Sequence, residues 1–412
     1  MKKFLFFPSF SAGNVAQAMS KKQSMRNDLD ISFFSTKFPK EFRHPYFLVS
    51  AGHYYKKPTF SKDFGFFDAP DMLLLGDSGG YQIASGAMKW DPKTVPMIFE
   101  WLENNSHVAM NLDIPPRMNY AGKFNEALDI SKKNFEYFAK KQTGKTKFLN
   151  VLQGSDESSY LQWYNSVKDF DFNGWGVGGA TTSIYRMMCA LNVLLSGKEH
   201  LNKNRKYLHI LGTSKVMDFF LLAQMQKSLN DVGSSIQVTT DSSTPSRAVT
   251  YGLYYYDVDF RSTSFKSLHV PKERAENNKS VTKNTANSIS SQESLLPNLI
   301  PFDDLLEGGY TYEDLRDWTI EGYAAVVLHN FMFFKDVMHK INSYVEGHPY
   351  FLEQVLNADN FMLLKSVDEM VKAYENGTTP AKVFAKYEQL YRKLSTINTT
   401  TNITNSKFFK QS

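Results

Sequence analysis

Short apolar segments alternate with longer amphipathic segments from the start of the chain to Asp241. The apolar segments have the length of β-strands, and we predict strands at 4–7, 45–51, 71–75, 107–112, 147–152, 174–177, 206–211 and 236–239. The segments between them predict helices over about 92–104, 123–141, 155–167, 183–196 and 213–229. This alternation is typical of βα units, and so many units in one run favour a closed TIM (β/α)8 barrel in the α/β class. An open doubly wound sheet is the alternative.

Polar residues or glycines follow these strands at the point where each one ends. The positions that share this feature are Asp77, Asp113, Gln153, Gly178, Gly179 and Asp241. The carboxyl ends of the strands meet at one mouth in a closed barrel, and catalytic groups lie there. Turn chemistry accounts for one or two such positions, but it is a weaker explanation for all of them. The sequence therefore predicts a single polar pocket.

Three carboxylates around one pocket can divide the work of glycosyl transfer. One carboxylate can attack the anomeric carbon of a sugar, and a second can move the proton of the departing or incoming group. A third carboxylate and the Gln153 amide suit a guanine-like base, because the carboxylate accepts from ring N–H and NH₂ groups while the amide donates to a carbonyl. Tyr81 can stack on such a base.

Residues 77–82 (Asp-Ser-Gly-Gly-Tyr-Gln) resemble the Asp-Ser-Gly-Gly-(Phe/Tyr)-Gln motif of the tRNA-guanine transglycosylases. Other short motifs resemble that family in the same order, at 108–113 (Val-Ala-Met-Asn-Leu-Asp), 151–154 (Val-Leu-Gln-Gly), 176–179 (Gly-Val-Gly-Gly), 207–212 (Tyr-Leu-His-Ile-Leu-Gly), 241–247 (Asp-Ser-Ser-Thr-Pro-Ser-Arg) and 329–330 (His-Asn). The resemblance covers about residues 45–345, and the order and spacing of the motifs carry it.

The family resemblance implies a barrel that exchanges guanine for a 7-deazaguanine without cutting the strand. It implies Asp241 as the nucleophile on C1′ and Asp77 as the general acid and base. The residues that it places against the base or the nucleic acid are Ser78, Gly79, Tyr81, Asp113, Gln153, Gly178, Gly179, His209 and Arg247. A core role for Tyr81 and a surface ion pair for Arg247 stay open. His329, on an apolar segment, is interpreted as a packed core residue.

The chain also departs from the family pattern. The tRNA enzymes hold a structural zinc with three cysteines ahead of the late histidine, whereas the matching region 298–303 has no cysteine and Cys189 is the only one in the chain. We therefore expect no metal and no other cofactor. His209 stands where the family has a methionine in the base pocket. With these differences the chain resembles the DNA-modifying branch of the superfamily more than the tRNA enzymes. That branch, found in phages and in bacterial modification clusters, puts 7-deazaguanines such as preQ0 into DNA.

The leading hypothesis is thus a DNA-guanine transglycosylase whose partners are DNA and a free 7-deazaguanine base. The alternatives are a tRNA transglycosylase without zinc, a catalytically idle barrel that binds nucleic acid or a partner transglycosylase, and an unrelated barrel glycosidase. A homodimer or a partner subunit stays open.

The length, net charge and apolar segments of the chain bear on these hypotheses. The chain has 412 residues and a net charge of only +5, which is compatible with a nucleic-acid partner without indicating one. No segment has the length of a signal peptide core or a membrane span, so we expect a cytoplasmic protein with no membrane partner. We expect the barrel over residues 1–265, a flexible polar insert over 266–296, a helical part that completes the barrel over 297–395, and a disordered tail over 396–412.

Overall fold

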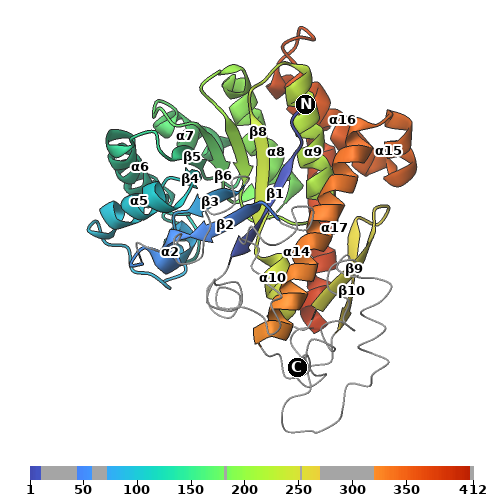
Figure 1. Ribbon diagram of the computed structural model, residues 1–412. Helices are drawn as coiled ribbons and strands as arrows, with labels where there is room; N and C mark the ends of the chain where they lie inside the picture. The colour runs from blue at the N-terminus through green and yellow to red at the C-terminus, as the bar shows by residue number, and fades with distance from the viewer. Residues whose placement is uncertain (11–43, 58–71, 181–182, 251–252, 270–319, 409–412) are drawn as a thin grey trace.

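The computed structural model describes residues 1–10, 44–57, 72–180, 183–250, 253–269 and 320–408. Its centre is a closed barrel of eight parallel strands (Figure 1), in which each strand pairs with the next and the last pairs with the first. The strands are β1 (Leu5–Phe10), β2 (Tyr46–Ser50), β3 (Leu73–Asp77), β4 (Val108–Met110), β5 (Lys147–Leu152), β6 (Gly174–Val177), β7 (Tyr207–Ile210) and β8 (Gln237–Ser242). The TIM-type barrel is confirmed, and the open sheet is excluded because β8 pairs with β1.

Helices on the outside of the barrel connect the strands. They are α2 (Ala51–Tyr54), α4 (Gly80–Ala84), α5 (Thr94–Asn105), α6 (Phe124–Lys141), α7 (Glu157–Val167), α8 (Ile184–Ser196), α9 (Val216–Asp231) and α10 (Thr244–Thr250). Asp156 caps the N-terminus of α7, where its Oδ1 accepts from the backbone N–H of Ser159 at 2.8 Å. Helix α5 begins two residues later than expected, because the Asp91 side chain accepts from the N–H of Lys93 in a turn that precedes the helix.

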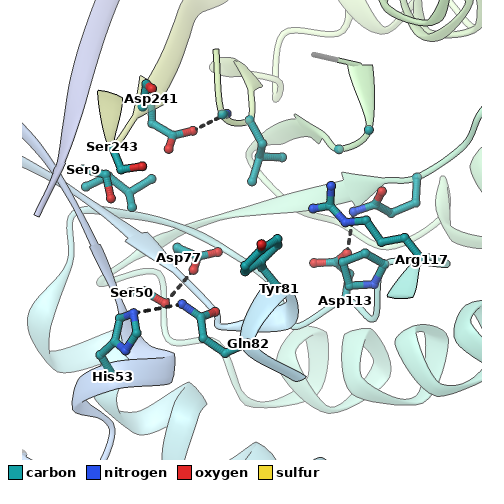
Figure 2. Close-up of a pocket in the computed structure, with 18 of the residues that line it drawn as sticks. Ser9, Ser50, His53, Asp77, Tyr81, Gln82, Asp113, Arg117, Asp241 and Ser243 are labelled. Carbon is teal, nitrogen blue, oxygen red and sulfur yellow. Dashed lines mark hydrogen bonds between the residues drawn. The ribbon is translucent and has the colours of Figure 1, made fainter. Parts of the chain in front are cut away.

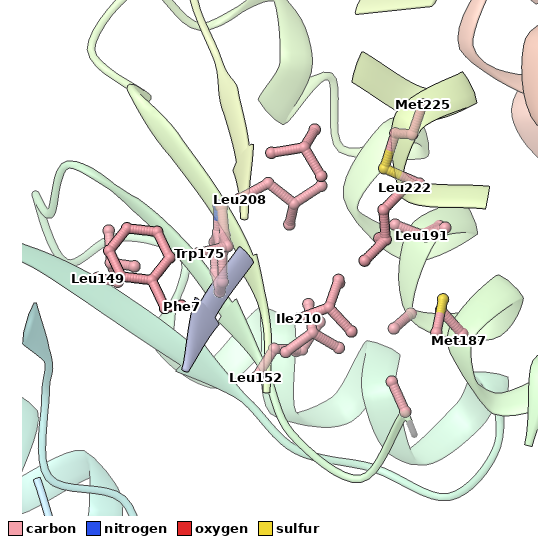
Figure 3. Packing of buried hydrophobic residues seen from close by; sticks show 14 of the residues in the cluster. Phe7, Leu149, Leu152, Trp175, Met187, Leu191, Leu208, Ile210, Leu222 and Met225 are labelled. Atoms are coloured by element: carbon pink, nitrogen blue, oxygen red, sulfur yellow. The ribbon is translucent and has the colours of Figure 1, made fainter. Parts of the chain in front are cut away.

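The alternation of inward and outward side chains along β7 decides which of them face the site. Leu208 and Ile210 are buried against Met187 and Leu191 of α8 and Leu222 of α9 (Figure 3). Truncating a leucine in such a layer to alanine costs about 2–5 kcal/mol. Because successive side chains of a strand point to opposite faces, His209, between Leu208 and Ile210, faces into the barrel. The outer apolar layer thereby fixes the direction of the polar side chains at the mouth.

The C-terminal part of the described chain packs against the barrel (Figure 1). It contains an antiparallel hairpin of β9 (Leu253–Asp259) and β10 (Ser264–His269), and the helices α14 (Ile320–Glu346), α15 (Pro349–Val355), α16 (Ala358–Val371) and α17 (Pro380–Phe408). Helix α14 contacts β1, α9 and α10. It therefore covers the barrel where the first and last strands meet.

Two expected boundaries in this part were wrong. Residues 266–269, assigned to the polar insert, belong to β10, where Lys266 pairs with Asp257 of β9. Residues 396–408, assigned to a disordered tail, continue α17, because no glycine or proline interrupts the segment. The rest of the insert, 270–296, and the segment 297–319 lie outside the described residues. In the described part of the chain, no helix is both long enough and apolar enough to cross a bilayer.

Candidate active site

A pocket of about 470 Å³ lies at the carboxyl ends of the barrel strands (Figure 2). The three strand-end carboxylates, Asp77, Asp113 and Asp241, all line it. The other expected residues in its wall are Tyr81, Gln153, Gly178, Gly179 and Arg247. Ser78, Gly79 and His209 are not in the wall. The structure thus brings together eight of the eleven expected site residues and places the other three behind the surface.

Asp77 is the last residue of β3, and Ser50 is the last residue of β2 beside it in register. The Ser50 hydroxyl donates to Asp77 Oδ2 at 2.6 Å. Burial raises the pKa of Asp77, the Ser50 hydrogen bond opposes that shift, and the negative charge of Asp241 adds to it. A carboxyl group with a raised pKa keeps its proton to higher pH than usual, which suits a general acid.

Asp113 and Gln153 form a buried polar pair in the pocket wall. Gln153 Nε2 donates to Asp113 Oδ2 at 2.7 Å. Burial raises the pKa of Asp113 to about 7, against the hydrogen bond from Gln153, and the charge of Asp77 contributes further. A Cβ on Gly178 would lie 2.2 Å from Gln153 Nε2, so only glycine at this position leaves room for the amide.

Asp241 lies on β8, and its side chain is held from behind. Its Oδ1 accepts from the backbone N–H of Gly212 at 2.7 Å, and Nε2 of His209 lies 3.2 Å from the same oxygen. His209 is fully buried, and its Nδ1 lies 2.9 Å from Thr239 Oγ1. The resemblance places His209 against the base, whereas in the structure its ring lies beneath Asp241 and outside the pocket wall.

Tyr81 and two arginines occupy the open side of the pocket. Tyr81, on α4, is 50% exposed, which excludes the core role. Figure 2 shows its ring between Asp77 and Asp113. The Arg117 guanidinium lies 5.2 Å from the centre of this ring. Arg247 is exposed on α10, six residues after Asp241.

Ser78 and Gly79 shape the turn that carries these groups. Gly79 has a φ of +93°, and a Cβ on it would lie 2.7 Å from the Cα of Gly52. Ser78 is buried, and its hydroxyl donates to the carbonyl of Asn111 at 3.1 Å. Both residues therefore fix the position of Asp77 and Tyr81 from behind the wall.

Other wall residues were missed from the sequence, among them Ser9, Ser50, His53, Arg117, Ser242 and Ser243. Ser50 is the last residue of β2, but the strand predicted over 45–51 placed it inside the strand, so the strand-end rule passed over it. Arg117 carries no strand-end signal, because it lies four residues beyond its strand-end aspartate, past two prolines.

No group of three or more His, Cys, Asp or Glu side chains that could hold a metal occurs among the described residues. The region 298–303, where the related zinc ligands would lie, is outside them. His329 is buried, and its Nε2 lies 2.6 Å from the carbonyl oxygen of Tyr255. Burial lowers the pKa of His329 to about 4. The structure thus agrees with the interpretation of His329 as a packed core residue.

Comparison with known proteins finds no family model that matches the chain and no matching curated protein. The resemblance to the tRNA-guanine transglycosylases therefore rests on the short motifs. The pocket adds that residues from six of these seven motifs, all but 329–330, line one cavity.

Proposed function

We propose that this protein is a base-exchange transglycosylase that replaces guanine in DNA with a 7-deazaguanine such as preQ0. The observation that carries the proposal is that three carboxylates line one pocket and that each has a different partner. A hydroxyl donates to Asp77, an amide donates to Asp113, and a backbone N–H donates to Asp241. Groups of one chemical type in different environments take different roles.

In the proposed reaction Asp241 attacks C1′ of the target nucleotide. The C1′–N9 bond breaks as the C1′–O bond forms, and Asp77 gives its proton to the departing guanine. The incoming base then attacks C1′ through N9, Asp77 takes the proton from N9, and Asp241 leaves as a carboxylate. The second half-reaction is the reverse of the first with a different base. The strand therefore stays intact, and the exchange needs no oxidant or reductant.

Asp113 and Gln153 are proposed to recognise the base. The carboxylate can accept from N1–H and the exocyclic NH₂ of a guanine-type ring, while the amide can donate to its O6. Tyr81 supplies an exposed aromatic face beside this pair. Stacking of a base on such a ring is worth about 1–3 kcal/mol.

The choice of DNA rests on the sequence resemblance and the missing cysteines. The pocket lies inside the mouth of the barrel, so the target guanine must leave the helical stack before C1′ of its nucleotide can react there. The exposed arginines, Arg117 and Arg247, stand at that mouth where they can meet phosphates. Such a reaction belongs in the cytoplasm of a bacterium or of a host cell that a phage has infected.

The test is incorporation of labelled guanine or preQ0 by the purified full chain, with DNA and tRNA offered in parallel. We expect label in DNA, and we expect Asp241→Asn to lower the rate by a factor on the order of 10⁴, as the loss of a nucleophile does. Asp359→Asn, at a half-buried aspartate paired with Lys393 on the C-terminal helices, is the matched control and should exchange normally. Label in tRNA alone would favour the tRNA enzyme without zinc. Label in neither would contradict the proposal and favour the idle binding barrel.

A further inference from the structure

We infer that His209 is a positioning residue that fixes Oδ1 of Asp241 and leaves Oδ2 to attack C1′. This inference rests on the proposed function for the identity of the reaction, but its geometric part stands without it. Both hydrogen-bonding contacts to the Asp241 carboxylate, from Gly212 and from His209, fall on Oδ1. Among the described residues no protein group hydrogen-bonds to Oδ2.

The strand register sets up this contact. His209 pairs with Thr239 across β7 and β8, and Asp241 follows Thr239 by two residues on the same face of β8. The imidazole therefore lies between a hydroxyl on one side and a carboxylate on the other, at 2.9 Å and 3.2 Å. Its ring cannot turn freely, because the side chain is fully buried.

The two neighbours of the ring also select its tautomer. An ionised carboxylate only accepts hydrogen bonds, so the nitrogen that faces Asp241 must carry a hydrogen. In the neutral imidazole Nε2–H then donates to Oδ1, which leaves Nδ1 as the acceptor for the Thr239 hydroxyl. The opposite tautomer would place a lone pair against the carboxylate. Thr239 thus helps to keep His209 in its donating form.

The two donors on Oδ1 of Asp241 act in both half-reactions. They hold the carboxylate plane, so that Oδ2 is the oxygen that forms the bond to C1′ and Oδ1 becomes the carbonyl oxygen of the ester. In the second half-reaction the C1′–Oδ2 bond breaks and negative charge returns to the carboxylate. The same donors stabilise that charge, and hydrogen bonds to charged groups are the stronger ones.

Direct contact with the base does not explain His209, because the side chain is buried and absent from the pocket wall. Filling of space is the remaining alternative. Methionine tests it, because it has a comparable volume and lacks the hydrogen-bond donor. Glutamine keeps an N–H donor at the position. Thr239→Val keeps the shape of the neighbour and removes the hydroxyl that orients the ring.

The experiment measures base exchange by the full chain at saturating DNA and varied base. We expect His209→Met to lower kcat about 10- to 100-fold with the KM for the base changed less than about twofold, as loss of a hydrogen bond to a charged group predicts. We expect His209→Gln to recover most of the rate and Thr239→Val to fall between the two. Wild-type kcat in a folded His209→Met protein would overturn the inference.

Crystal structures of the wild type, His209→Met and His209→Gln separate this inference from the proposed function. We expect Asp241 to keep its carboxylate orientation and its bond to the Gly212 N–H in the wild type and the glutamine variant, and to rotate in the methionine variant. If the wild type exchanges no base, the proposed function fails and the structures still decide the positioning role. An unchanged Asp241 carboxylate in His209→Met would overturn the inference in that case too.

Discussion

Three aspartates share one pocket, yet the residues next to them make them chemically different. Burial raises the pKa of both Asp77 and Asp113. Asp77 accepts a hydrogen bond from a hydroxyl, and Asp113 accepts one from an amide. Asp241 is held instead by a backbone N–H and an imidazole on a single oxygen. These contacts suit an acid, a base-reading carboxylate and a nucleophile in turn.

Asp113 should lower the stability of the protein at neutral and alkaline pH. Its pKa is raised to about 7 in the folded state, so the folded protein binds a proton that the unfolded chain releases at its ordinary, lower pKa. The free energy of unfolding should therefore fall as pH rises from about 4 to about 7. Asp113→Asn removes this effect and keeps an oxygen that can accept from Gln153.

Urea unfolding of the wild type and Asp113→Asn at pH 5 and pH 8 measures this effect. We expect the variant to gain on the order of 2 kcal/mol relative to the wild type between the two pH values. It should also lose base exchange, because an asparagine cannot accept both donors of a guanine edge. The same stability difference at both pH values would show that Asp113 does not carry a raised pKa.

The sequence predicted the three carboxylates and Gln153 because strand ends can be found from apolar runs, and barrel strands all end at one mouth. It did not predict that His209 is buried behind the pocket wall in contact with Asp241. That contact depends on how β7 and β8 pair, and a family motif cannot supply the register. Arg117 was missed for a similar reason, since its place over Tyr81 is set by loop geometry.

At the scale of elements, helix α14 is tied to the barrel by two buried asparagines. Asn342 bonds the N–H and the carbonyl of Phe4, just ahead of β1. Asn330 donates to the carbonyls of Pro245 and Leu253 and accepts from the N–H of Tyr255. Asn330 thereby holds α10, which follows β8 in the chain, whereas Asn342 acts at the other end of the barrel.

The two asparagines form a matched pair of variants on one helix. Asn330→Leu and Asn342→Leu should each lower the free energy of unfolding by about 2–4 kcal/mol, because each leaves buried backbone groups without partners. Only Asn330→Leu should also lower the rate of base exchange in the protein that remains folded, because it releases α10 and Arg247. Urea unfolding and exchange assays on both variants measure this. An equal loss of rate in both would contradict a local role for Asn330.

All eight barrel strands and the five longer helices between them were predicted, because they repeat the same alternation of apolar and amphipathic segments, whereas the short helices α2, α4 and α10 were not. The β9–β10 hairpin was missed although its aromatic and β-branched residues favour strands, since it interrupts that alternation. The end of α17 was missed because threonine and asparagine favour turns and caps in general. Both misses fall where the βα alternation ends, and local propensity pointed the wrong way only at the end of α17.

At the scale of the whole molecule, barrel closure brings the two ends of the barrel sequence together at the site. Phe7 of β1 pairs with Asp241 of β8, so the first strand supports the proposed nucleophile. The exposed Arg117, in the segment after β4, and Arg247, on α10, both line the pocket at this mouth. This arrangement predicts that a polyanion approaches the molecule from the carboxyl end of the barrel.

Removing either arginine should weaken DNA binding and reduce its dependence on salt. Each phosphate contact contributes about 0.7–0.9 to the slope of log affinity against log salt concentration. We expect Arg117→Ala and Arg247→Ala each to reduce the slope by about that amount in fluorescence anisotropy titrations. Lys203→Ala removes an exposed charge ahead of β7, at the opposite end of the barrel, and should leave the slope unchanged. A slope equally sensitive to Lys203 would indicate attraction by net charge alone.

The measurement that tests the central claim most directly is the mapping of a covalent adduct. The full chain is incubated with DNA in the absence of an incoming base, the reaction is quenched with acid, and the digested protein is examined by mass spectrometry. We predict a sugar-linked nucleotide on the carboxylate of Asp241, and no adduct in Asp241→Asn. An adduct on Asp77 or Asp113, or guanine release without any adduct, would contradict the assignment of Asp241 as the nucleophile.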